Sequence, residues 1–326
     1  MHNRRELLAV LGAAALFQCA AMPAAQAQTF PSKPIRLIVG FPPGGPADYT
    51  ARLIADKLPA LMGVNVVVEN RVGANATIGA DYVAKSPPDG HTIFLTTCGA
   101  VAISPHIGAK LPYDPLRDFA PIAQVVTAYS TIAVHPSLPA RNAQEFVALA
   151  RARKGQITMA STGVGSIPHL AQELFKAAAR IDLVHVPYKG AGPSVTDAIG
   201  GQIMSLVLDV TPLLPHIKAG KLRAIGIAGD KRVPLLPEVA TMEEQGFRNV
   251  EAPNWYALFA PAKTPRAIVD RLNDAVRKVI AMDDVRERLI STGADPVLST
   301  PEQLADLLNR DYAKWGKLIR DNNITE

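Results

Sequence analysis

Short apolar runs alternate along the chain with segments whose apolar residues recur at helical spacing. The first run covers residues 35–39, and after it Ala51, Ile54 and Leu58 fall on one face of a helix. Similar apolar runs are found at 64–69, 92–96, 122–126, 131–134, 157–160, 183–186, 203–208, 222–228 and 256–260. Strands that alternate with helices in this way are typical of an α/β protein with largely parallel sheets.

Capping residues and prolines mark the expected helix ends. Asp48, Asn142 and Ser166 each precede a helical pattern and can accept a hydrogen bond from its first turn. Thr300 opens a capping-box pattern before the last helix. Pro59 predicts a kink or the end of the first helix, because proline lacks the backbone donor that a helix interior needs.

The length and the order of elements predict two α/β lobes. A chain of 326 residues exceeds the usual size of a single hydrophobic core. Proline-rich, irregular sequence between 97 and 124 leads into two extended segments, which indicates a crossing between lobes. We expect residues 28–126 and 237–326 to form one lobe and residues 127–236 to form the other.

The first 27 residues have the order of an export signal. Arg4 and Arg5 are followed by the mostly apolar residues 7–21, and a small-x-small motif ends at Ala27. We therefore expect export to the periplasm with cleavage near Ala27. No later segment has the length of uncharged apolar sequence that a membrane span needs.

Charge and composition narrow the possible partners. The formal net charge is +5, but the basic residues are scattered, so we expect no nucleic-acid partner. Cys98 is the only cysteine after the signal segment, which excludes an intrachain disulfide and a cysteine-based metal cluster. The histidines lack ligand spacing, and residues 163–166 lack the ending of a phosphate-binding loop. We expect no metal and no cofactor.

Loops rich in Gly, Pro, Ser and Thr follow several of the expected strands. One such loop alone is more typical of a turn, but the carboxyl ends of strands are where open α/β sheets bind ligands, and two facing sets would form a cleft. Backbone and hydroxyl donors of this kind suit a carboxylate. The candidate ligand-binding residues are Phe41, Pro43, Gly44, Gly45, Asp48, Thr97, Cys98, Ser161, Thr162, Gly163, Gly165, Ser166, His169, Pro187, Tyr188, Lys189, Gly190 and Asp209.

Some of these candidates have a second interpretation. Asp48 and Asp209 can serve as helix caps, and a single loop lysine such as Lys189 is often only solvated. Ser166 and His169 could also be the nucleophile and base of an exported serine hydrolase. No Gly-x-Ser-x-Gly motif surrounds Ser166, so the sequence favours a structural histidine over a catalytic pair.

Several motifs in a fixed order resemble the Bug family, the periplasmic binding components of tripartite tricarboxylate transporters. The motifs are Phe41-Pro42-Pro43-Gly44-Gly45, Glu69-Asn70-Arg71, Pro88-Asp89-Gly90, Gly163-Val164-Gly165-Ser166, Val186-Pro187-Tyr188-Lys189-Gly190 and Ala219-Gly220-Lys221-Leu222-Arg223. Departures from the family pattern occur at Asn75-Ala76, at Thr97-Cys98-Gly99 and at Val210. Those at 97–99 and 210 bear on the distal end of the solute.

The resemblance implies a two-lobed periplasmic binding fold of the type II kind. Each lobe would be a mainly parallel sheet flanked by helices, with the ligand cleft between the lobes. The loops 42–45 and 161–166 would grip a carboxylate, partly through ordered water. The implied function is capture of a small carboxylate-bearing solute for uptake, without catalysis, by a monomer that docks on a membrane transporter. A membrane sensor is the alternative partner.

Overall fold

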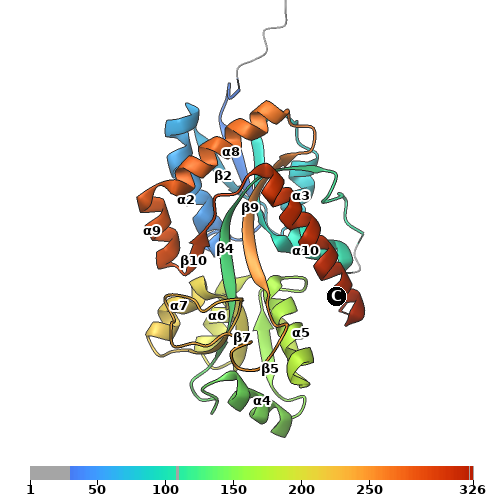
Figure 1. Cartoon of the computed structure of the whole chain (residues 1–326), viewed down its shortest axis with the longest axis vertical. Helices are drawn as coiled ribbons and strands as arrows, with labels where there is room; N and C mark the ends of the chain where they lie inside the picture. The colour runs from blue at the N-terminus through green and yellow to red at the C-terminus, as the bar shows by residue number, and fades with distance from the viewer. Residues whose placement is uncertain (1–29, 108–109, 323, 326) are drawn as a thin grey trace, which may run out of the picture.

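The computed structural model describes residues 30–107, 110–322 and 324–325. The expected export signal and its cleavage site at Ala27 lie outside these ranges. The chain forms two lobes that are stacked along the long axis of the molecule (Figure 1). None of the helices in the described ranges combines the length and apolar character needed to cross a bilayer.

The upper lobe is built on a sheet whose first three strands are parallel. Strands β1, β2 and β3 follow the order β2-β1-β3, and β9 joins β3 in antiparallel orientation. Five α-helices and two short helical segments flank this sheet. The elements are β1 (Ile35–Val39), α2 (Pro46–Met62), β2 (Val66–Asn70), α3 (Thr77–Ala84), β3 (Thr92–Thr97), η1 (Gly99–Ile103), η2 (Ser104–His106), β9 (Pro253–Pro261), α8 (Arg266–Ala281), α9 (Asp283–Ser291), β10 (Ala294–Pro296) and α10 (Pro301–Asp321).

The lower lobe repeats the alternation of strands and helices on a second, smaller sheet. Strand β5 pairs in parallel with β6 on one side and with β7 on the other. The elements are α4 (Ala143–Ala152), β5 (Thr158–Ser161), α5 (Ile167–Ala179), β6 (Val184–Pro187), α6 (Ala191–Ile199), β7 (Ser205–Asp209), α7 (Val210–Lys218) and β8 (Arg223–Ala228).

One long strand, β4 (Phe119–Val134), belongs to both sheets. Residues 119–129 pair with β9, and residues 130–134 pair with β7 and β8. The sequence predicted two separate extended segments here, whereas the structure has one continuous strand. The strands joined by helices are parallel, as expected, but β4 and β9 make antiparallel pairs, so both sheets are mixed rather than mainly parallel.

The segment 237–252 contacts the lower lobe before the chain returns upward as β9. Thr241 forms a bridge with Ile227 of β8, and the Gln245 side chain accepts a hydrogen bond from Ala143 N at 2.7 Å. The lobe boundary expected at residue 237 assigns this segment to the upper lobe, whereas its contacts are with elements of the lower lobe.

Alternate residues of the upper strands bury their side chains on opposite faces of the sheet. Leu37 and Leu95 pack with the apolar faces of α2 and α8. Ile38 and Phe94 belong to the cluster that contains residues of α3 and α10, including Trp315. The continuous apolar runs in these strands follow from burial on both faces.

Helix ends agree with the predicted caps at Asn142, Ser166 and Thr300, each of which accepts a hydrogen bond from the first turn. The first helix differs from its prediction at both ends. Its N-cap is Gly45, which leaves Asp48 inside the first turn, and the helix continues past Pro59 to Met62.

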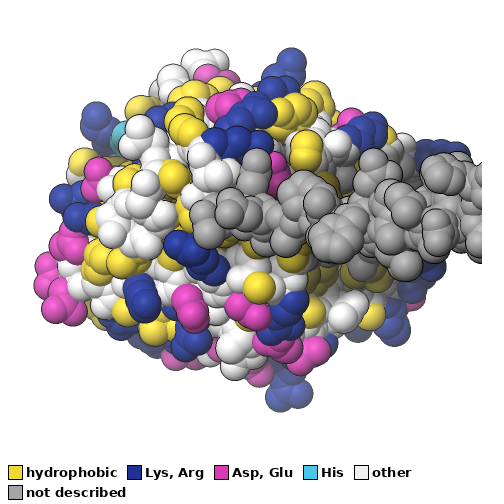
Figure 2. All heavy atoms as spheres, turned by 90° about the horizontal axis from the view of Figure 1, so that it is seen from above, with side chains coloured by type: hydrophobic (Ala, Val, Ile, Leu, Met, Phe, Trp, Pro, Cys, Tyr) yellow, Lys and Arg dark blue, Asp and Glu magenta, His cyan; other side chains and the backbone are white. Residues whose placement is uncertain are grey.

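The upper surface carries charges of both signs. Figure 2 shows Lys and Arg side chains intermixed with Asp and Glu and with apolar groups, without a large field of one sign.

Candidate functional site

Strand register brings the candidate loops of each lobe to one sheet edge. In the upper sheet, Val39 lies opposite Leu95, so the loops that follow β1 and β3 are neighbours. In the lower sheet, Ser161 lies opposite Pro187, and β7 runs parallel to β5 on its other side. The carboxyl ends of five parallel strands therefore carry nearly all of the candidate residues.

The two sets of loops touch each other across the lobes. Asn75 Nδ2 donates a hydrogen bond to Gly165 O at 2.7 Å. A Cβ at Gly190 would lie 3.6 Å from Pro42 Cγ, and a Cβ at Gly165 would lie 3.2 Å from Ile107 Cδ1. The lobes thus approach closely where the candidate residues gather, and Gly165 is the position at which a side chain would be crowded.

Asp48 holds the first loop in shape. Its carboxylate accepts hydrogen bonds from Gly44 N at 2.9 Å, Arg52 Nε at 2.8 Å and Asn70 Nδ2 at 2.8 Å. Burial opposes ionisation, but these three donors outweigh it and hold the pKa of Asp48 below its usual range. Asp48 is 2% exposed, and its carboxylate is engaged within the loop.

The backbone amides of the two glycines in this loop donate hydrogen bonds to acceptors within the loop and at the start of α2. Gly44, at φ +77°, donates to Asp48, and Gly45 N donates to Pro42 O at 3.4 Å. The donors that remain in the first turn of α2 are the amides of Ala47 and Asp48, because Pro46 has no N–H and Tyr49 N donates to Gly45 O at 2.9 Å. Phe41 is half-buried and Pro43 is exposed.

The loop after β5 is held by its own side chains. Ser161 Oγ lies 2.7 Å from His185 Nε2 and accepts a hydrogen bond from Gly163 N at 3.1 Å. Ser166 Oγ donates to Gly163 O at 2.7 Å. The positive φ of Gly163, +136°, allows this turn.

His169 and His185 stack with ring centroids 4.0 Å apart. Burial lowers the pKa of each imidazole to about 4, so both are neutral at pH 7. His169 Nδ1 accepts a hydrogen bond from Gly165 N at 3.3 Å, while Ser166 Oγ is the cap of α5. The Ser166 hydroxyl and the His169 ring are thus engaged separately, without a hydrogen bond between the two side chains.

The loop after β6 lies against the loop after β5. Tyr188 N donates to Ser161 O at 3.1 Å, and Gly190 N donates to Thr162 O at 3.2 Å. The Tyr188 hydroxyl bonds to Asp197 of α6 at 2.7 Å. Pro187 and Lys189 are exposed at this edge.

Asp209 lies where the two sheets meet. Its Oδ2 accepts hydrogen bonds from Asn254 Nδ2 at 2.9 Å and Tyr256 OH at 2.6 Å. Burial raises its pKa, although these two donors act in the opposite direction. The Cys98 thiol is fully buried 3.4 Å from Asn254 Oδ1, and burial raises its pKa. Thr97 faces Tyr256 in the strand pairing.

Two residues at this junction, Asn254 and Tyr256, and Asn75 at the lobe contact were missing from the sequence prediction. Asn254 and Tyr256 were placed in or beside a strand without a role, and no local pattern shows their contact with Asp209. The sequence did contain an indication that Asn75 is unusual, because it departs from the family pattern. It lies at φ +50° between Ala74 at +45° and Ala76 at +71°, a run of left-handed residues that is costly without glycine.

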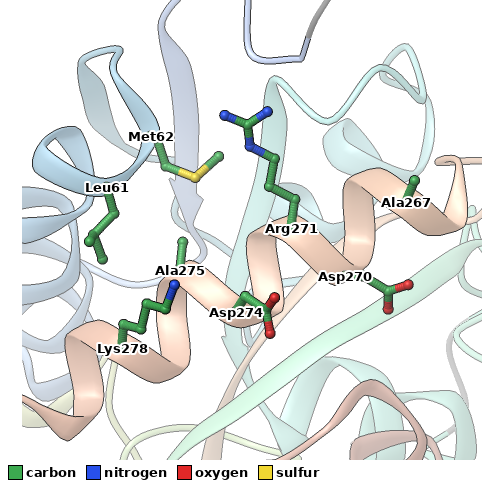
Figure 3. A pocket seen from close by; sticks show the side chains of 8 residues that line it. All are labelled: Leu61, Met62, Ala267, Asp270, Arg271, Asp274, Ala275 and Lys278. Carbon is green, nitrogen blue, oxygen red and sulfur yellow. The ribbon is translucent and has the colours of Figure 1, made fainter.

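A separate surface hollow lies between α2 and α8 (Figure 3). It is lined by Leu61, Met62, Ala267, Asp270, Arg271, Asp274, Ala275 and Lys278. Leu61 is near the end of α2, roughly 22 Å along the helix from the candidate loops. Within the described ranges, no three His, Cys, Asp or Glu side chains converge as metal ligands would.

Two α/β lobes whose strand ends face each other, joined by a shared strand, define a two-lobed binding protein. Residues 50–324 match the model of the tripartite tricarboxylate transporter family receptor, TctC. The chain belongs to this family of solute-binding receptors, and the expected two-lobed fold and Bug-type resemblance are confirmed.

Relatives match along nearly the whole chain. A protein from the tcbD-tcbE intergenic region of Pseudomonas sp. (strain P51) is 39% identical, over 97% of this chain and 94% of the relative. Protein BugT of Bordetella pertussis is 34% identical, over 98% of each chain.

Solved structures agree with the fold. The periplasmic binding protein BugD has a TM-score of 0.85 at 31% identity, covering 91% of this chain and 99% of its own. Rpa4515 of R. palustris, solved with adipate, has a TM-score of 0.87 at 31% identity with the same coverage. MatC of Rhodopseudomonas palustris, with bound malate, has a TM-score of 0.83 at 31% identity, covering 89% and 100%.

Proposed function

We propose that the mature chain captures a small carboxylate-bearing solute between its lobes in the periplasm, after export and cleavage near Ala27. The observation that carries the proposal is the contact of the two sets of strand-end loops, with Asn75 bonded to Gly165 across the lobes. Adipate and malate in the two related structures support a carboxylate as the ligand class.

The grip on the carboxylate is assigned to the loops that follow β1, β5 and β6. First-turn amides of α2 and hydroxyl or amide donors of 161–166 can offer several hydrogen bonds to one anion. We assign Asp48, Ser166 and His169 to shaping these loops. The other candidates are proposed as the wall of the site.

We further propose that the chain acts without turnover and as a monomer, and that the loaded form docks on a tripartite transporter in the membrane. A membrane sensor would use the same closed form. Affinity capture from solubilised membranes, with and without solute, identifies the partner.

The test of solute capture is calorimetric titration of the mature protein with mono- and dicarboxylates, including aromatic ones. At least one should bind in the micromolar range. The absence of binding to the whole panel would contradict the proposal, and hydrolysis of ester substrates that is lost in Ser166→Ala would favour the hydrolase instead.

A further inference from the structure

One oxygen of the buried Asp209 carboxyl group has no hydrogen-bond partner among the described residues. Asp209 is 7% exposed, and Oδ2 receives both donors, Asn254 and Tyr256. Oδ1 is buried and unpaired. A buried acceptor without a donor is costly, so this oxygen is a natural contact point for a group that enters with the solute.

A second unpaired group lies directly beside it. Ser130 of β4 is opposite Asp209 of β7 in the antiparallel pairing, so the two side chains share one face of the sheet at a separation of about 5 Å. Ser130 is fully buried, and its Oγ also lacks a partner in the described part of the chain. The carboxyl oxygen and the hydroxyl together form a buried polar point beside Asn254 and Tyr256.

The position of this point connects it to the proposed site. Asn254, which holds Oδ2 of Asp209, also contacts the Cys98 thiol in the loop after β3. Asp209 itself ends β7, at the same sheet edge as the loops that follow β5 and β6. Both groups of the polar point belong to the lower sheet, and Asn254 of β9 connects them to the upper lobe, where the far end of an enclosed solute would lie.

The charge balance indicates which group fits. Among the ion pairs of the described residues, none includes Asp209, so no lysine or arginine compensates its charge. A hydroxyl or ammonium group can donate to Oδ1, whereas a second carboxylate would bring two like charges together at low dielectric. A donor at this point also favours the ionised form of this carboxyl group, whose pKa burial raises.

We propose that Asp209 Oδ1, with Ser130 Oγ, selects solutes that carry a hydrogen-bond donor at the end remote from their gripped carboxylate. This inference rests on the proposed function. The solute class is then hydroxy or amino carboxylates rather than simple dicarboxylates.

The test uses the wild-type mature protein and matched acids of three to six carbons. Each chain length is titrated in the unsubstituted, ω-hydroxy, ω-amino and ω-carboxy form. At the best length, the hydroxy or amino form should bind at least about tenfold more tightly than the other two, and the ratio of hydroxy to amino identifies the donor. Equal or tighter binding of the dicarboxylate overturns the inference but leaves solute capture intact. Failure of every acid to bind overturns both.

A pair of variants tests the assignment to Asp209. In Asp209→Asn, the donors Asn254 and Tyr256 hold the amide oxygen, so the amide NH₂ replaces Oδ1 and donates. The preference should then reverse toward the ω-carboxy form. Tyr256→Phe is the matched control, because it removes a donor to Oδ2 and leaves Oδ1 in place, so the wild-type preference should remain. An unchanged preference in Asp209→Asn overturns the assignment to Asp209. If that variant does not fold, the titrations of the wild-type protein still decide whether donor-bearing acids bind more tightly than dicarboxylates.

Discussion

The hydrogen bond from Asn75 to Gly165 should stabilise the closed arrangement of the lobes. Removing the amide in Asn75→Gly eliminates this bond, which has an N···O distance of 2.7 Å. A hydrogen bond of this kind contributes about 1 kcal/mol net, which corresponds to roughly a fivefold change in an equilibrium constant. We therefore expect solute affinity to fall by about fivefold.

Glycine is the informative replacement, because Asn75 has a φ of +50°. Glycine accepts this conformation without the steric cost that alanine would meet. Asn75 lies in the loop between β2 and α3, which belongs entirely to the upper lobe. Any relief of backbone strain in this loop therefore acts on the open and closed forms alike. Such relief changes the free energy of unfolding but cancels in the closing equilibrium.

The assay combines calorimetric titration with small-angle scattering of the ligand-free protein. Asn75→Gly should weaken binding and increase the radius of gyration. Asn142→Ala is the control, because it removes the α4 cap, far from the lobe contact, and should lower stability by about 1 kcal/mol without a change in affinity. Affinity of Asn75→Gly within twofold of wild type would refute the reasoning.

Three further predictions concern residues in and beside the candidate loops. Gly44→Val places a β-branched residue at φ +77° and should destabilise the fold by about 1 to 2 kcal/mol and weaken solute binding; a folded variant with wild-type affinity would contradict the role of this loop. Ser166→Ala removes the α5 cap and should cost about 1 kcal/mol in urea unfolding, with no change in ester hydrolysis. His169 and His185 are neutral in the folded state, with pKa values of about 4. As the pH falls, the unfolded state binds protons on these two rings before the folded state does. The contribution of the neutral rings to the free energy of unfolding is therefore complete above about pH 6.5 and is lost as the pH falls toward 4. At pH 5 the loss is about 2 kcal/mol for each ring. An unchanged urea midpoint between pH 7 and 5 would exclude it.

Local sequence predicted what depends on neighbouring residues. The apolar runs gave the strands buried on both faces, and the caps at Asn142 and Ser166 were found because each accepts from an amide three residues ahead. The break expected within β4 covers residues 127–130, where the backbone continues the strand. Thr127 pairs with Trp255 of β9, and Ser130 pairs with Asp209 of β7.

What the sequence missed depends on partners far away along the chain. Asp48 resembled a helix cap, and only the fold brings Asn70 to its carboxylate. The partner of Asn75 is 90 residues away, and the partners of Asp209 are more than 40 residues away, so no spacing rule connects them. The loops of the candidate site could be predicted, but the division into residues that shape them and residues that face a solute could not.

The shared strand β4 makes the two lobes mutually dependent for folding. Its residues 119–129 complete the upper sheet and residues 130–134 complete the lower one, so an isolated lobe would expose an unpaired strand edge. Local opening of one sheet removes the support of the other through a single continuous backbone. The chain has two lobes for binding but should behave as one cooperative unit when it unfolds.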